Sequence, residues 1–451
     1  MKILFLSANR LSVPYPVYPI GLDFLSGVLE KKHTVEIIDT AWTSEQEIAS
    51  AIQSLDPDLV GISIRNIDNS DLVETRDFLD DYRSLADLVR KSTRSPLVLG
   101  GSGFTIAPEA LMESLDADYG IIGEGERLLP LADELESGGN VGDLNLPGMM
   151  VRGKPRPETP EPWHGPIVQN FRKERGIADH YLRRGGMLNL QTKRGCPYSC
   201  IYCTYPLIEG NTVRCFDPTK VGRTARKLQD AGAAFIFVTD AVFNSDSNHA
   251  VETARAIKKA GLTIPWGAYF APVKTRDDFW SVMAECGLTH VEFGTESLSN
   301  AMLKTYRKPF DAVTALESHR RAVDAGLNVA HFFLLGGPGE NEKTLDETFL
   351  NAEKLNKSGC FFFCGIRIYP GTELCSIAKK QGQISEDTNP LNPVFYSPPE
   401  LQESRLLEIM EDRARGRSGW IAGSGGARMA KVLSKMYDLG HTGPLWEKLI
   451  R

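Results

Sequence analysis

Two blocks of alternating short apolar runs and amphipathic segments constrain the fold of this chain more than any other feature. A stretch rich in glycine, proline and charge separates them. Apolar runs that alternate with helical patterns are typical of parallel sheets with helices packed on their faces. The chain has 451 residues, enough for two or three domains. We therefore predict an α/β protein with a linker at residues 138–185.

The first block, residues 1–137, predicts a doubly wound domain of the flavodoxin-like kind. Its expected strands are Lys2–Leu6, Thr34–Ile38, Asp58–Ile64, Pro96–Leu99 and Ala117–Ile122. Its expected helices span about 20–31, 43–54, 71–91, 107–114 and 126–137. A ligand of such a domain lies outside the carboxyl ends of the strands, so the loops at those ends are candidate binding segments.

Those loops are rich in glycine and polar residues. Ser7–Pro19, with several prolines and tyrosines, follows the first strand, and Arg65–Asn69 follows the third. Gly100–Phe104 and Gly123–Glu126 follow the fourth and fifth strands. Glycine lets backbone N–H groups approach a ligand closely, and helix N-termini attract phosphate. Ordinary turn glycines are the alternative explanation.

The second block, residues 186–382, predicts a partial, open (β/α)6 barrel similar to a TIM barrel, with its active centre at the carboxyl ends of the strands. The expected strands are Met187–Lys193, Ala234–Asp240, Ile264–Phe270, His290–Gly294, Asn328–Leu335 and Phe361–Ile368. The expected helices begin near Pro218, Ser247, Arg276, Asp311 and Glu340. Residues 383–451 are expected to form a small, mostly helical region that caps the substrate.

Three cysteines, Cys196, Cys200 and Cys203, lie in one short segment that leaves the first strand of this barrel. In a reducing compartment such a group indicates metal binding or catalysis rather than a disulfide. Three thiolates can hold a [4Fe–4S] cluster and leave one iron open for another ligand. A zinc site completed by Cys215, or a group of structural thiols, is the alternative.

The cysteine segment resembles the radical S-adenosylmethionine (SAM) superfamily, over about residues 185–382. The resemblance implies that the three cysteines bind a [4Fe–4S] cluster and that SAM binds its fourth iron. It also implies that an electron from an external donor, such as flavodoxin or ferredoxin, leads to cleavage of SAM to a 5'-deoxyadenosyl radical.

The same resemblance implies SAM contacts at the ends of other barrel strands. Glu296, in Gly294–Ser297, would accept hydrogen bonds from the ribose, with Lys308 beside it, and Asp240 would contact the methionine amino end. Segments expected around the adenine contain Tyr202, Gly336, Gly337, Arg367 and Tyr369. Helix capping by Glu296 and Asp240 is the alternative.

Given this context, the first block resembles the cobalamin (B12)-binding domain that precedes many radical SAM domains, over residues 1–137. The resemblance implies a corrin on the rim of the sheet. The residues expected around the cofactor are Ser7, Tyr18, Ser63, Arg65, Asn66, Gly101, Ser102, Gly103, Phe104, Gly123, Glu124, Gly125 and Glu126. The loop after the first strand has no histidine, so we expect cobalt without a histidine lower axial ligand and with Arg65 or Asn66 near its lower face. A vestigial domain without a ligand is the alternative.

Together the two resemblances imply a cobalamin-dependent radical SAM methyltransferase that methylates an unactivated carbon of a small molecule. Radical ring formation, ring contraction or rearrangement without methyl transfer is an alternative, and a cobalamin-binding sensor is another. The chain has no cysteine before Cys196, unlike methylthiotransferases, which use N-terminal cysteines for a second cluster.

Composition bounds the partners and the location. Fifty-one basic against 58 acidic residues give a net charge of -7, which disfavours a nucleic-acid backbone as partner. The opening MKILFLSANR contains an apolar run of only four residues, too short for the apolar segment of a signal peptide. No apolar stretch of membrane-spanning length occurs, so we expect a cytoplasmic enzyme. Candidate substrate contacts are the region after 383, Trp266, Tyr269, Phe270, His331, Cys360 and Cys364.

Overall fold

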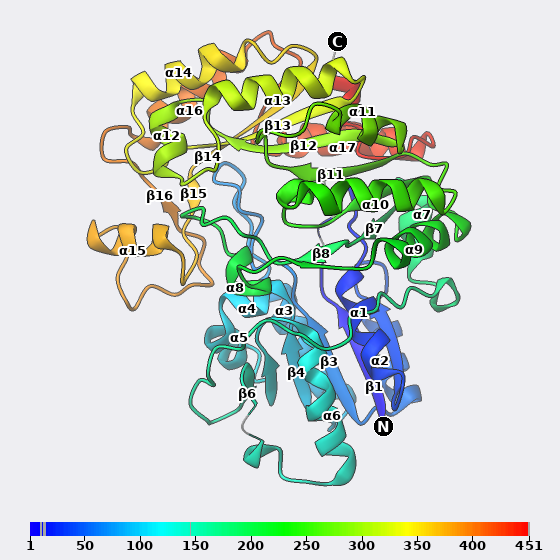
Figure 1. Ribbon diagram of the computed structural model, residues 1–451. Coiled ribbons are helices and arrows are strands. Elements are labelled where there is room, and N and C mark those ends of the chain that lie inside the picture. The colour runs from blue at the N-terminus through cyan, green and yellow to red at the C-terminus, as the bar shows by residue number, and fades with distance from the viewer. Residues whose placement is uncertain (10, 12–14, 145, 450–451) are drawn as a thin grey trace.

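The computed structural model describes the chain except for residues 10, 12–14, 145, 450 and 451, so part of the Ser7–Pro19 loop lies outside the described residues. Two sheets, each covered by helices, lie one above the other, the N-terminal sheet below and the second sheet above it (Figure 1). The carboxyl-end loops of the first sheet face the second, and this places both sets of candidate residues between them.

The first sheet has the strand order β2-β1-β3-β4-β5-β6. The first five strands are parallel, and their order 2-1-3-4-5 confirms the flavodoxin-like topology. They are β1 (Lys2–Ser7), β2 (Thr34–Asp39), β3 (Leu59–Ser63), β4 (Leu97–Gly100) and β5 (Tyr119–Ile121). The helices are α1 (Ile20–Leu29), α2 (Glu45–Leu55), α3 (Leu79–Ser92), α4 (Ser102–Ile106), α5 (Pro108–Ser114), η1 (Gly125–Arg127) and α6 (Leu128–Ser137).

Two features of this sheet differ from the expectation. The helix expected from residue 71 begins at Leu79, because Asn69 holds the preceding segment in a turn: its Oδ1 accepts from the Arg76 amide at 3.0 Å. The expected linker contributes β6 (Met149–Val151), which pairs antiparallel with β5. The first sheet therefore extends beyond the expected boundary at 137.

The second sheet is a parallel, open barrel with the order β17-β14-β13-β12-β11-β10-β7. The strands are β7 (Met187–Leu190), β10 (Phe235–Val238), β11 (Trp266–Phe270), β12 (Leu288–Glu296), β13 (Asn328–Leu335), β14 (Ser358–Cys364) and β17 (Trp420–Ala422). The covering helices include α9 (Pro218–Asp230), α10 (Ser247–Lys259), α11 (Phe279–Glu285), α13 (Ala312–Asp324) and α14 (Glu342–Ala352). Asp217, Asp246 and Asp311 cap the N-termini of α9, α10 and α13 with their side chains, which explains where those helices begin.

The C-terminal region is less simply helical than expected. It supplies the seventh strand, β17, which pairs with β14. The strand expected at 361–368 ends at Cys364, because Gly365 has φ +76°, and the chain then forms β15 (Ile366–Arg367), paired antiparallel with β16 (Phe395–Tyr396). The other elements are η2 (Val141–Asp143), η3 (Lys173–Arg175), α7 (Ala178–Arg183), β8 (Lys193–Arg194), α8 (Tyr205–Glu209), β9 (Arg214–Cys215), η4 (Phe243–Ser245), α12 (Asn300–Thr305), α15 (Glu373–Lys380), α16 (Glu403–Ala414), α17 (Gly426–Asp438) and η5 (Trp446–Leu449).

None of the helices among the described residues is long and apolar enough to cross a membrane.

Candidate active site between the two sheets

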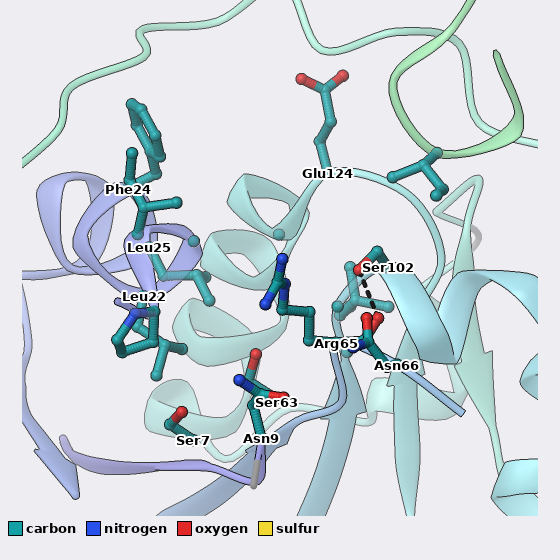
Figure 2. Close-up of a pocket in the computed structure, with 18 of the residues that line it drawn as sticks. Ser7, Asn9, Leu22, Phe24, Leu25, Ser63, Arg65, Asn66, Ser102 and Glu124 are labelled. Atoms are coloured by element: carbon teal, nitrogen blue, oxygen red, sulfur yellow. Dashed lines mark hydrogen bonds between the residues drawn. The ribbon is translucent and has the colours of Figure 1, made fainter. Parts of the chain in front are cut away.

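A cavity of about 510 Å³ lies between the two sheets. One wall comes from the carboxyl ends of β1, β3 and β4 and from the Gly123–Glu126 loop. The opposite wall includes Thr204 and Tyr205, which directly follow Cys203. Figure 2 shows Ser7, Ser63 and the Arg65 side chain directed into this space. The cavity therefore joins the two predicted functional regions of the chain.

Most residues that we expected around a corrin line this cavity. They are Ser7, Tyr18, Ser63, Arg65, Asn66, Gly101, Ser102, Gly123, Glu124, Gly125 and Glu126. Gly103 and Phe104 do not line it, contrary to expectation: Phe104 is fully buried in the core of the first domain, and Gly103 packs against the Arg65 backbone. No histidine is among the cavity residues that the structure describes.

Gly101 is required by the chain's own packing, not only by a ligand. Its φ is +100°, and an added Cβ would lie 2.5 Å from the Ile64 carbonyl oxygen. The adjacent Ser102 hydroxyl donates to the Arg65 carbonyl oxygen at 2.8 Å (Figure 2). The loops after β3 and β4 thus hold one another, and this fixes where the Arg65 side chain begins.

The three cysteines are free thiols in the loop after β8, with Cys196 buried and Cys200 and Cys203 half-buried. Sulfurs around one tetrahedral zinc ion would lie about 3.8 Å apart. Among the described residues, these thiols form no group whose ligand atoms all lie within 4.8 Å of one another. Cys215 is exposed and pairs with Lys193 in the β8–β9 ladder. The arrangement therefore does not favour a single zinc ion held by these thiols and Cys215.

A buried ion pair lies beside the thiols. Lys308 Nζ is 2.5 Å from Glu296 Oε2 and donates to the Tyr202 hydroxyl at 3.4 Å. Glu296 has φ +57°, where the β12–β13 register shifts, and this unusual conformation directs its carboxylate. Burial alone would lower the pKa of Lys308, but Glu296 and the Cys200 sulfur hold it above its ordinary value. The charged ammonium therefore lies next to the thiols.

Asp240 already has partners inside the protein. Lys193 Nζ donates to its Oδ2 at 2.9 Å, and the Thr192 amide donates to its Oδ1 at 2.7 Å. Both Lys193 and Asp240 are 1% exposed, so the pair ties the end of β10 to the segment that leads into the cysteines. Contact of Asp240 with SAM stays a prediction, and the structure gives this residue a positioning role.

The residues expected around adenine lie in two places. The amides of Gly336 and Gly337 donate to Glu340 Oε2 at 2.6 and 3.3 Å, so this turn closes on its own carboxylate. Arg367 Nε donates to Asp68 Oδ2 at 2.8 Å, and the Tyr369 hydroxyl bonds Asp68 Oδ1 at 3.2 Å. Arg367 and Tyr369 thus join the barrel to the first domain, and an adenine contact for them stays a prediction.

Arg194, two residues before Cys196, makes a buried link between the domains. Its guanidinium lies 2.6 Å from Glu124 Oε1 and 2.8 Å from Glu126 Oε1, and all three side chains are nearly inaccessible. Arg214 adds a second cation, 2.9 Å from Glu124. Burial opposes ionisation of Glu124, yet the two arginines hold its pKa below the ordinary value. We call Arg194, Arg214, Glu124 and Glu126 the interdomain clamp.

Comparison with known proteins identifies both halves of the chain. Residues 6–132 match the B12 binding domain family, and residues 190–352 match the Radical SAM superfamily. The chain carries a B12-binding domain followed by a radical SAM domain. The cavity therefore lies between its B12-binding domain and its radical SAM domain.

Relatives with the same two halves are similar over most of their length. Cytidylyl-2-hydroxyethylphosphonate methyltransferase of Streptomyces wedmorensis is 26% identical over 86% of this chain and 83% of that protein. Tryptophan 2-C-methyltransferase of Streptomyces laurentii is 24% identical over 79% of this chain and 71% of that protein. The structure of the radical SAM methyltransferase TsrM from Kitasatospora setae, with tryptophan and a SAM analogue bound, has 21% identity and a TM-score of 0.87 over 99% of this chain and 97% of that one. This last similarity confirms the fold.

Several substrate contacts that we expected in the radical SAM domain are core residues. Trp266, Phe270 and His331 are at most 1% exposed and face outward from the barrel toward its helices. Cys360 and Cys364 are buried in an apolar cluster with Phe362. Tyr269 differs, because it lies on the inner face and is 39% exposed. Strand alternation separates these two sets.

Sequence reasoning missed Arg194, Tyr205 and Glu209, which also line the cavity. The available signal was their position, since Arg194 and Tyr205 lie within two residues of the cysteine motif.

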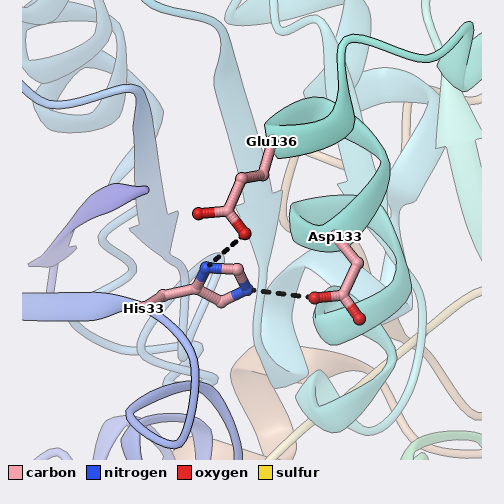
Figure 3. A group of neighbouring side chains, drawn as sticks. All are labelled: His33, Asp133 and Glu136. Carbon is pink, nitrogen blue, oxygen red and sulfur yellow. Dashed lines mark ion pairs between the residues drawn. The ribbon is translucent and has the colours of Figure 1, made fainter.

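His33, Asp133 and Glu136 form the one group of potential ligand atoms found within 4.8 Å of one another in the part of the chain that is described (Figure 3). Each imidazole nitrogen faces a different carboxylate: Nε2 is 3.3 Å from Asp133 and Nδ1 is 3.6 Å from Glu136. The N-terminal amine pairs with Glu136, and Lys32 Nζ is 2.7 Å from Asp133. Both carboxylates thus already have cationic partners within the protein, so the group is explained by ion pairs and hydrogen bonds without a metal.

Proposed function

We propose that this protein is a cobalamin-dependent radical SAM methyltransferase that methylates a carbon atom of a small molecule. The observation that carries the proposal is the shared cavity, which the glycine loops of the B12-binding domain line together with Thr204 and Tyr205, next to the cysteines. The methyltransferase names of the relatives support methyl transfer in particular.

Different segments of the chain would bind different cofactors. Cys196, Cys200 and Cys203 would hold the cluster, and Ser63–Asn66, Gly101–Ser102 and Gly123–Glu126 would surround the cobalamin. When bound, the cluster, SAM and cobalamin supply radical formation and methyl donation. Lys308 and Glu296 provide a fixed cation and carboxylate at the cysteine side. The interdomain clamp holds the two binding regions at a set separation.

Arg65 is the charged residue that we expect to influence bound cobalt. It extends into the cavity from the end of β3, and no histidine lines the described part of that cavity. A guanidinium beside bound cobalamin would offer cobalt no lone pair, and its positive charge would favour the more reduced forms of the cofactor. The external electron donor and the cytoplasmic location stay predictions.

The decisive experiment incubates anaerobically reconstituted, reduced protein with SAM, cobalamin and candidate small molecules. Methylation predicts S-adenosylhomocysteine together with 5'-deoxyadenosine. Ring formation or rearrangement predicts 5'-deoxyadenosine alone. Formation of neither product, in protein that contains iron, sulfide and cobalamin, would leave only a binding or sensing role.

A further inference from the structure

Several aromatic side chains on the inner face of the barrel are only partly buried. Tyr269 lies on the inner face of the barrel, in register with Glu292, yet 39% of the residue is accessible. Phe332, Phe361 and Phe363 are likewise only half-buried. Their outward-facing neighbours Phe333 and Phe362 are fully buried. Strand register places all four partly buried side chains on the inner face, so their accessible parts border open space there, which we call the hollow.

The walls of this hollow are aromatic. Phe332 stacks on Phe361 with ring centroids 5.1 Å apart, and the Tyr269 ring lies 4.9 Å from that of Phe237. Gly294, paired in register with Phe332, adds no side chain between the two sets of rings. Flat apolar groups pack well against such faces and edges.

One carboxyl group lies at the inner side of the hollow. Glu292 is the register partner of Tyr269 and of Ala330, so it belongs to the same inner face. Its Oε1 accepts a hydrogen bond from Trp446 Nε1 at 2.9 Å. No described residue donates to its other oxygen or forms an ion pair with it. Burial raises the pKa of Glu292 to about 7.

The hollow borders the cofactor cavity. Arg65 and Tyr205 line that cavity, and both lie near enough to Tyr269 for their charges to interact. Tyr15, from the B12-binding domain, lies close to both Tyr269 and Glu292. A molecule held against Tyr269 and Glu292 is therefore next to both proposed cofactor regions.

We propose that this hollow is the substrate site and that the substrate combines a flat aromatic group with a cationic amine, which pairs with Glu292. The inference rests on the proposed function, because the substrate of such an enzyme must lie between the cysteine loop and the corrin region. The aromatic walls account for the flat group. The second carboxyl oxygen of Glu292, to which no described residue donates, accounts for the amine, because a cation placed there would pair with it.

Three probes test the two parts of this substrate class on the full-length, cobalamin-loaded protein: tryptamine, indole-3-propionate and 2-cyclohexylethylamine. We expect tryptamine to bind at least about tenfold more tightly than either of the others in equilibrium dialysis, since a hydrogen bond to a charged group contributes that much. Glu292→Gln should weaken tryptamine about tenfold and leave indole-3-propionate unchanged. The near-isosteric amide keeps the acceptor for Trp446.

Glu447→Gln is the matched control. Glu447 lies on η5 next to Trp446, but it pairs with His290 at 3.3 Å. This variant should bind tryptamine as the original protein does. A general disturbance of the C-terminal region would instead weaken binding equally in both variants and would overturn the proposal.

A pH series adds a readout that a merely structural role would not affect. Tryptamine affinity should rise as the pH passes through about 7, because Glu292 must lose its proton to pair with the amine. The other titratable groups facing it are Tyr15 and Tyr269, whose raised pKa values keep them neutral, and His290 is common to both proteins. The rise should vanish in Glu292→Gln.

Equal affinities for the three probes, or binding of none, would overturn the inference. The assay for 5'-deoxyadenosine formation from SAM does not depend on where the substrate binds. Its result therefore tests the proposed function separately from this inference.

Discussion

At the residue scale, a buried ion pair beside the cysteines is the main feature of the candidate site. Lys308 and Glu296 are 8% and 12% exposed at the side chain, and both lie beside the cysteines. Removing one partner of such a pair leaves the other charge buried without compensation, which commonly costs about 3–5 kcal/mol.

Cys200 allows a direct test of the cluster assignment. Cys200→Ala should lose the iron-sulfur absorbance and the formation of 5'-deoxyadenosine together, because three thiolates are the minimum for the site. Cys215→Ala, at an exposed cysteine outside the group, should keep both. Iron content near that of the original protein in Cys200→Ala would refute the assignment.

Arg65 should influence cobalt through its charge. A nearby cation favours the more reduced, more negative form, so Arg65→Gln should lower the cobalt reduction potential, by on the order of 60 mV for a tenfold change in the equilibrium. Spectroelectrochemical titration of bound cobalamin measures this shift. Arg320→Gln, at an exposed i,i+4 pair remote from the cavity, is the control and should leave the potential unchanged. An unaltered potential in Arg65→Gln would remove the residue from the site.

Elements of the barrel are joined by hydrogen bonds as well as by apolar packing. His331 on β13 bonds the Thr295 hydroxyl at 2.7 Å and His319 of α13 at 3.0 Å. Thr295 precedes Glu296, so this chain of bonds supports the strand end that carries the carboxylate. Burial lowers the pKa of His319 to about 4.

This histidine pair predicts acid sensitivity. Unfolded histidine binds a proton below about pH 6.5, whereas folded His319 stays neutral down to about pH 4. The unfolded state thus binds more protons in this window, and stability contributed by the pair is lost as the pH falls through it. We expect the free energy of unfolding, measured in urea, to differ between pH 7 and pH 5, and His319→Asn should reduce this difference by about 1–3 kcal/mol. Identical slopes in the two proteins would show that the pair does not titrate in this way.

The whole molecule depends on ionic contacts between its two domains. The interdomain clamp links the Gly123–Glu126 loop to the segment before the cysteines, and Asp68 with Arg367 adds a buried pair at 2.8 Å. Ion pairs on the protein surface contribute little to stability. The groups in these pairs are instead removed from water, so loss of one partner would leave a buried charge uncompensated. The relative position of the two sheets is therefore specified by a few residues.

Arg194→Gln should destabilise the domain contact by about 3–5 kcal/mol, because Glu126 would remain buried without a cation. Thermal unfolding should shift to lower temperature, and limited proteolysis between residues 138 and 185 should accelerate. The Arg320→Gln control should change stability by less than about 0.5 kcal/mol, since its pair is exposed. Unchanged protease sensitivity in Arg194→Gln would show that other contacts hold the domains.

The local order of the chain was largely predictable, as the cysteine loop and the helices that begin after Asp217, Asp246 and Asp311 show. These features depend on neighbouring residues, so periodicity and capping reveal them. The bond from Arg367 to Asp68 and the full burial of Phe104 could not be predicted, because a motif position does not say which partner a side chain meets.

Sequence by itself determined the two α/β halves and the thiol spacing, because strand periodicity and ligand spacing are properties of short segments. Only the tertiary structure decided that Arg194 meets Glu124 and Glu126, and that Tyr269 and Glu292 share one inner face. Those contacts join residues far apart in the chain, and their energies come from burial, which exists only after the domains have packed.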